Sequence, residues 1–164
     1  HTFSFFFRRA KIIVLCLILF FIIPLYAQFT DTFFFINIYA KGFQYIHSQP
    51  DSATWFFEIA KKESENRKYF AGIVMYHNYS AAIQISSGQS EKALKHYDSA
   101  IAIAFNNNLN TERGITYMKK GTLSQFMGEY ALAAEYYLVA ASLLKTNEER
   151  KYIIGLYKNI LSIS

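Results

Sequence analysis

Cysteine, proline and glycine are scarce in this chain of 164 residues, which contains one cysteine, two prolines and seven glycines. A single cysteine excludes an internal disulfide framework and a cysteine metal site. Because proline and glycine interrupt regular structure, their scarcity favours long helices over a sandwich of many short strands. The length accommodates one ordinary domain, or a few helical repeats together with a targeting segment.

Apolar and aromatic residues are abundant instead, with 16 phenylalanines, 13 tyrosines and one tryptophan, so the chain can bury a substantial core. The formal net charge of +5 is concentrated at the N-terminus. Residues 1–27 contain three basic residues and no acidic residue, and the remainder contains 14 basic against 12 acidic residues. Basic pairs in that remainder are scattered and interrupted by glutamate, so we expect no nucleic-acid partner.

The N-terminal segment has the pattern of an export signal. An apolar stretch from Ile12 to Ala27 follows three basic residues, Arg8, Arg9 and Lys11. Cleavage after Ala27 would leave Gln28 as the mature N-terminus. The alternative is an uncleaved membrane anchor, because Leu25 is large for a cleavage site and the stretch approaches the roughly 20 residues that span a bilayer. In either case we expect residues 28–164 to be exported across the inner membrane, either periplasmic or membrane-anchored.

Three stretches of the remaining chain repeat one another at a spacing of forty residues. Each has a small, an aromatic and a small residue at spacings of four and three, and the three sets are Ala53, Phe57 and Ala60, then Ala93, Tyr97 and Ala100, then Ala133, Tyr137 and Ala140. Residues at these spacings share one face of a helix. A fixed period of this length is typical of stacked helical repeats, in which each unit buries its apolar face against its neighbours.

The register places two helices in each unit. We expect helix pairs over residues 33–47 and 50–64, 69–86 and 90–106, and 111–127 and 129–145. Asp51 and Ser90 are expected to cap second helices, and Gly88 and Gly128 to provide tight turns. The unit boundaries are marked by asparagines, at Asn66, 106–108 and Asn147.

The sequence of these units resembles the tetratricopeptide repeat. Residues 88–104, GQSEKALKHYDSAIAIA, are similar to the second half of that repeat, and residues 117–144 match more of its consensus. In the latter segment Tyr117 stands at the aromatic position of the first helix and Gly121 at its close-packing small position. The resemblance covers about residues 33–147. It departs from the family in lacking the terminal proline and in its period, which is roughly 34 residues in the family.

The resemblance implies an all-α fold. It would be an α-solenoid of about three stacked helix-turn-helix repeats with an extra C-terminal helix, preceded by an N-terminal apolar helix. The domain organisation is then a signal peptide or anchor over residues 1–27 and a repeat domain over residues 28–164. Within that domain we expect units at about 33–66, 69–107 and 111–147, and the extra helix at 149–164.

The side chains that could catalyse a reaction or ligate a metal do not occur at the spacing of any recognised motif. The four histidines, His1, His47, His77 and His96, form no HExxH motif and no pair at i and i+4, and the glycines form no phosphate-binding loop. His77 and His96 are interpreted as interface or surface residues. We therefore expect no catalytic residue, no cofactor, no metal site and no enzymatic activity.

In the tetratricopeptide family the first helices line a concave face that binds peptides or proteins. The register puts eight residues on that face: Tyr39, Tyr45, Tyr79, Ala82, Met118, Lys119, Thr122 and Phe126. Some members hold a peptide carboxylate in a clamp of lysine, asparagine and arginine, and here only Lys119 fits that clamp. The sequence predicts a mixed aromatic and polar groove for an extended peptide or a helix. The alternative is that several of the tyrosines simply pack.

These expectations describe an exported, non-catalytic scaffold with a protein or peptide partner, which would contact the membrane through its N-terminal segment if that segment is uncleaved. The long period beside a signal or anchor resembles the extracytoplasmic sensory part of bacterial signalling regulators. The final unpaired helix would fit truncation before an output domain, or a solvating cap helix. A structural or assembly subunit of a cell-envelope complex is the alternative. A helical-repeat enzyme is less favoured, because the inward positions contain no carboxylate.

Overall fold

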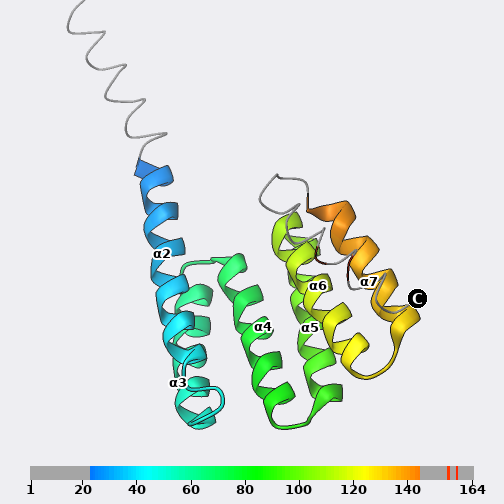
Figure 1. The fold of residues 1–164 in the computed structure, drawn as a ribbon. Helices are drawn as coiled ribbons and strands as arrows, with labels where there is room; N and C mark the ends of the chain where they lie inside the picture. Colours follow the sequence, from blue (N-terminus) through cyan, green and yellow to red (C-terminus); the bar gives the residue numbers. More distant parts are fainter. Residues whose placement is uncertain (1–22, 145–154, 156–157, 159–164) are drawn as a thin grey trace, which may run out of the picture. The chain divides into compact units, whose positions relative to one another are not determined.

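The computed structural model describes residues 23–144 together with Gly155 and Lys158. These residues form six helices and no strand: α2 (Ile23–Phe43), α3 (Pro50–Asn66), α4 (Phe70–Ser86), α5 (Ser90–Asn106), α6 (Asn110–Phe126) and α7 (Tyr130–Leu143) (Figure 1). The basic residues and most of the apolar stretch of the expected export signal lie outside the described residues. So does the expected extra helix over 149–164, apart from Gly155 and Lys158.

The chain divides into two compact units, His1–Asn37 and Ile38–Ser164, with the boundary inside α2. The structure describes residues 23–37 of the first unit, and they form the first part of α2. Helix α2 runs through Ala27 and Gln28, so the expected cleavage point falls within it. The division of the chain at residue 27 stays a prediction.

Helices in the second unit recur every twenty residues. Helices α3, α4, α5 and α6 each contain 17 residues, and α3 to α7 begin at Pro50, Phe70, Ser90, Asn110 and Tyr130. The expected bounds are therefore close to the observed ones, with one exception. The first helix was expected over 33–47, but α2 begins earlier, at Ile23, and ends at Phe43. A turn follows, in which the Tyr45 N–H donates to the Gly42 carbonyl.

The four turns after α3, α4, α5 and α6 share one backbone conformation. Their central residues, Lys68, Gly88, Asn108 and Gly128, have φ angles of 53°, 72°, 57° and 83°. After α4, the Gly88 N–H donates to the Ile85 carbonyl and the Gln89 N–H to the Gln84 carbonyl, as in a Schellman motif. The glycine turns are confirmed, whereas the first unit boundary is centred on Lys68 and not on Asn66.

The expected capping by Asp51 and Ser90 is wrong. The N-cap positions are Gln49 and Gln89, and neither side chain bonds the helix backbone. Ser90 is already the first residue of α5, so its hydroxyl is one position too late to cap. Pro50 opens α3, where its missing N–H costs no hydrogen bond.

The repeated small and aromatic residues form the core of the second unit. All nine members of the three sets are at most 4% exposed. Each buried ring contributes about 1.5–3 kcal/mol to folding. Gly121 is confirmed as a close-packing position, because a Cβ atom there would come within 2.7 Å of the Tyr137 ring.

Neighbouring helices pack in the order of the chain. Contact is most extensive between α4 and α5 and between α6 and α7, and less so between α3 and α4 and between α5 and α6. Helix α4 also touches α6, its next neighbour but one. The described part of the chain is thus all-helical with packed neighbours, which is consistent with a helical repeat.

Candidate functional site

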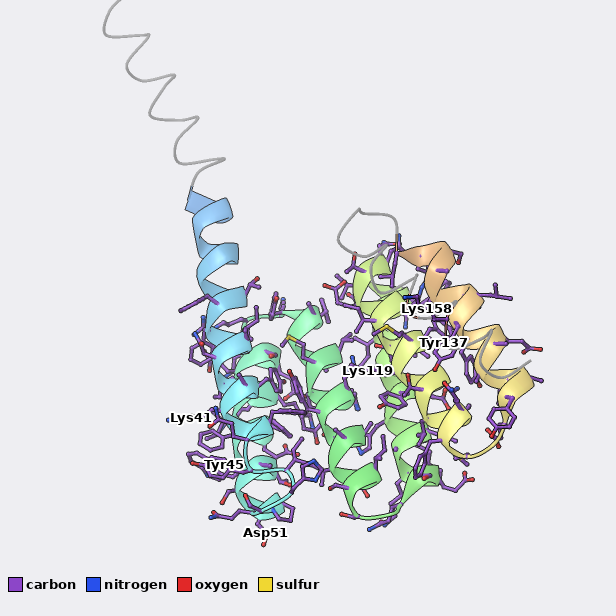
Figure 2. The ribbon with its side chains drawn as sticks, in the orientation of Figure 1. Lys41, Tyr45, Asp51, Lys119, Tyr137 and Lys158 are labelled. Carbon is purple, nitrogen blue, oxygen red and sulfur yellow. The ribbon has the colours of Figure 1, made fainter. Side chains whose placement is uncertain are left out.

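Three of the eight expected groove residues meet in one hollow. Lys119, Thr122 and Phe126, all on α6, line an open space of about 350 Å³. The remaining lining residues come from α4, α5 and α6, and are Ile85, Tyr97 and Leu123. We call this space the Lys119 hollow. Figure 2 shows Lys119 between α4 and the following helices.

The ammonium of Lys119 is the one charged group of the hollow. The side chain is half-buried, and no ion pair or hydrogen bond links it to any other described residue. Burial lowers the pKa of Lys119, because the charged form loses hydration that nothing replaces. An anionic group entering the hollow would therefore find an uncompensated positive charge.

The adjacent residue Lys120 has the opposite environment. Its Nζ lies 2.5 Å from an oxygen of Asp98 and 4.7 Å from the ring centre of Tyr136. Burial acts to lower the pKa of Lys120, but the hydrogen bonds to Asp98 and Tyr136 outweigh it, and the pKa is raised. Lys120 is therefore paired within the fold, whereas Lys119 has no such partner among the described residues.

Aromatic rings form the floor and the rim of the Lys119 hollow. Tyr97 is 4% exposed and lies at its base, and Phe126 is 80% exposed. Phe126 is the most exposed of the large apolar side chains that the structure describes. A hollow with an apolar floor, one exposed phenylalanine and one unpaired lysine suits a partner with both apolar and acidic side chains.

The prediction that Tyr39 lines a groove is wrong, because this side chain is 0% exposed. Its hydroxyl donates to the Gly72 carbonyl at 2.9 Å, and burial raises its pKa above the ordinary tyrosine value. Tyr79 is half-buried and its ring stacks on that of Tyr39, with centroids 5.0 Å apart and planes 9° apart. The Tyr79 ring also contacts Phe57 and Phe43, at centroid distances of 5.2 and 5.9 Å. These two tyrosines pack, as the alternative interpretation expected.

The other expected groove residues lie apart from the Lys119 hollow. Tyr45 follows α2 and stacks on Phe56 in a second open space, of about 550 Å³, that Asp51 and Trp55 also line (Figure 2). Met118 packs against the buried residues of α7, and Ala82 is half-buried on α4.

Two histidines that sequence reasoning left apart come together between α4 and α5. The Nδ1 atoms of His77 and His96 are 3.2 Å apart. The neighbouring Tyr76 hydroxyl donates to Glu58 at 2.6 Å, and the Lys61 ammonium lies 4.9 Å from the Tyr76 ring centre. A separation of 19 residues across a turn matches no short motif, so the sequence carried no signal for this pair.

Two features of the described residues bear on the remaining expectations. Within residues 23–144, none of the helices combines the length and apolar character that a membrane crossing requires. The same part of the chain holds no cluster of three or more histidine, cysteine, aspartate or glutamate side chains able to surround a metal ion.

Comparisons of the chain with protein-family models, with curated proteins and with solved structures give no match in any of the three. The resemblance to tetratricopeptide repeats therefore stays a prediction from the sequence, and what the described residues show is an all-helical fold with packed neighbouring helices.

Proposed function

We propose that this chain is a tetratricopeptide-like solenoid that binds proteins or peptides without catalysis. Helices of equal length, the twenty-residue interval between their starts and the shared turn conformation all support stacked helix pairs. The contact between α4 and α6 supports an inner face formed by first helices.

The observation that carries this proposal is the Lys119 hollow on α6. A binding face needs an anchor that folding does not use, and both Phe126 and Lys119 meet that need. We infer that an apolar side chain of the partner packs against Phe126 while an adjacent carboxylate pairs with Lys119. The hollow is open, so the partner would be an extended segment or a helix rather than a small molecule.

Selection from random peptides tests this proposal without knowledge of the natural partner. We expect phage-displayed peptides selected on the full chain to combine acidic and apolar residues. Phe126→Ala should weaken the selected peptides about tenfold or more, as expected for a central anchor. Phe105→Ala is the matched control, since Phe105 is 64% exposed on α5 outside this hollow. Equal affinity for both variants would refute the assignment.

We further propose that the scaffold is exported, on the strength of the basic and apolar pattern of residues 1–27. It would serve as the sensory part of a bacterial signalling regulator or, as the second candidate, as a subunit of an envelope assembly. A C-terminal fusion to alkaline phosphatase, which is active only outside the bacterial cytoplasm, tests export. Activity of the full-length fusion, lost on deletion of residues 1–27, is expected. An inactive full-length fusion would contradict export and leave peptide binding unaffected.

A further inference from the structure

The facing rings of His77 and His96 join α4 to α5 within one helix pair. Their Nδ1 atoms are 3.2 Å apart, their ring centres are 5.5 Å apart, and their planes meet at 46°. Both side chains are half-buried. In this arrangement one Nδ1 donates a hydrogen bond and the other accepts it.

The distance between the two nitrogens is also the one that a shared metal ion requires. Two imidazole nitrogens bound to one tetrahedral ion at about 2.0–2.1 Å lie about 3.3 Å from each other. The observed separation is within 0.1–0.2 Å of that value. The spacing therefore permits a shared ion in place of the shared hydrogen, with each ring turned so that its Nδ1 lone pair points at the ion. The donor ring would then carry its hydrogen on Nε2, so both Nδ1 lone pairs become free to ligate.

The charge state of the pair suits a metal ligand. Burial, together with the smaller effects of His96 and Lys61, lowers the pKa of His77 to about 4, while Glu58 acts in the opposite direction. Burial also lowers the pKa of His96. Both rings are thus neutral near pH 7, which is the form of imidazole that binds metals.

There is room for further ligands beside His96, on a side that His77 does not line. A small hollow of about 110 Å³ is lined by His96 together with the polar side chains of Glu58, Tyr76, Ser80 and Gln84. Water molecules in this space could complete a coordination shell, because the described residues supply no third metal-ligating side chain at the pair. The Lys61 ammonium stands on the Tyr76 ring and opposes a cation nearby, whereas the Glu58 carboxylate favours one.

We propose that His77 and His96 bind one divalent transition-metal ion through their Nδ1 atoms, with solvent filling the remaining positions. Imidazole ligands suit Zn²⁺, Cu²⁺ and Ni²⁺, and Cu²⁺ should bind most tightly of the three. The described residues supply only two protein ligands, so we expect an affinity in roughly the micromolar range rather than the nanomolar range of closed sites. The ion would link α4 to α5 and stabilise the folded chain by mass action.

Calorimetric titration of the full chain with ZnCl₂ and CuCl₂ tests this site. The expected result is one ion per chain, with binding weakened roughly tenfold or more in His77→Ala and in His96→Ala, a loss of about 1.4 kcal/mol each. The control is His1→Ala with His47→Ala, which removes the two other histidines and should leave the affinity unchanged. Binding that survives in both single variants, or that is lost in the control, would overturn the proposal.

A spectroscopic measurement keeps the test decisive if the single variants unfold. Electron paramagnetic resonance of Cu²⁺ bound to the control variant should show two imidazole nitrogens in the coordination shell. One nitrogen or none would overturn the site. The proposed peptide-binding function would be unaffected by that outcome, because the pair lies outside the Lys119 hollow.

Discussion

Tyr79 and Lys119 lie forty residues apart at the same position of successive first helices, yet their surroundings differ. The Tyr79 ring is stacked on Tyr39 and contacts Phe57, so the aromatic side chains fill the space beside it. Beside Lys119 that space is an open hollow above Tyr97. The second helices carry equivalent buried residues both next to Tyr79 and next to Lys119. The repeated positions therefore account for stability, whereas a position that differs between units can pack, as Tyr79 does, or border an open space, as Lys119 does.

The largest effect is expected from removing a repeated core residue. Tyr137 is 1% exposed, and its hydroxyl donates to Gln125 at 2.9 Å. Tyr137→Ala should lower the free energy of unfolding by about 3–5 kcal/mol, measured by urea denaturation. Tyr130→Ala on the same helix is the control, since Tyr130 is 52% exposed. Similar losses of unfolding free energy in both variants would show that the repeated position contributes no more to stability than an exposed one.

Overpacking the small positions should have the next largest effect. Ala133 is 0% exposed and belongs to a buried cluster with Tyr137 and Ala140, so a ring added there would have to displace its neighbours. Ala133→Phe should cost about 1–3 kcal/mol of stability. Thermal unfolding checks this, with Ala131→Phe at an exposed site of the same helix as the control. An unchanged midpoint for Ala133→Phe would contradict the proposed packing.

The histidine pair should make stability depend on pH. The pKa of His77 is lowered to about 4 in the folded chain, so between about pH 6.5 and 4 the unfolded state binds more protons. Stability is thus full above pH 6.5 and falls as the pH drops through that window. His77→Gln should remove about 1–2 kcal/mol of this fall, after allowance for solvent screening. Urea unfolding without metal, at several pH values, measures it, and identical pH profiles for both proteins would contradict the assignment.

Substitutions in two of the turns should change stability by a smaller amount. Lys68 and Gly128 occupy the same left-handed position, at φ angles of 53° and 83°, although only glycine adopts it without strain. Lys68→Gly should stabilise the chain by about 0.5–1 kcal/mol, and Gly128→Ala should destabilise it by about 1 kcal/mol. A Cβ atom at Gly128 would meet nothing within 4 Å, so that loss reports the backbone alone. Differential scanning calorimetry would detect both shifts, and shifts of equal sign would be inconsistent with a shared turn.

The sequence predicted the buried second helices well because helical periodicity directly reports which side chains face a neighbour. Ala53, Phe57 and Ala60 could be placed in the core without any tertiary information. Turn positions were predictable where glycine or asparagine marks them. Lys68 was missed because nothing in its chemistry favours a positive φ.

The solvent exposure of side chains in the first helices was less predictable than burial in the second helices. It depends on which ring of the next unit covers each side chain. Tyr39 and Lys119 share a phase, but Tyr39 is covered by the Tyr79 ring, whereas no ring of the described residues stacks in the same way over Lys119. The meeting of His77 and His96 depends likewise on how α4 and α5 pack. No local pattern encodes such a contact.

Substitution of Lys119 by methionine tests the separation between stability and recognition most directly. The change keeps an unbranched side chain and removes an unpaired, partly desolvated charge. Urea unfolding should show stability unchanged or raised by up to about 1 kcal/mol. Fluorescence anisotropy should show selected acidic peptides binding about tenfold more weakly. A loss of stability with unchanged peptide affinity would mean that Lys119 serves the fold, and would contradict the account.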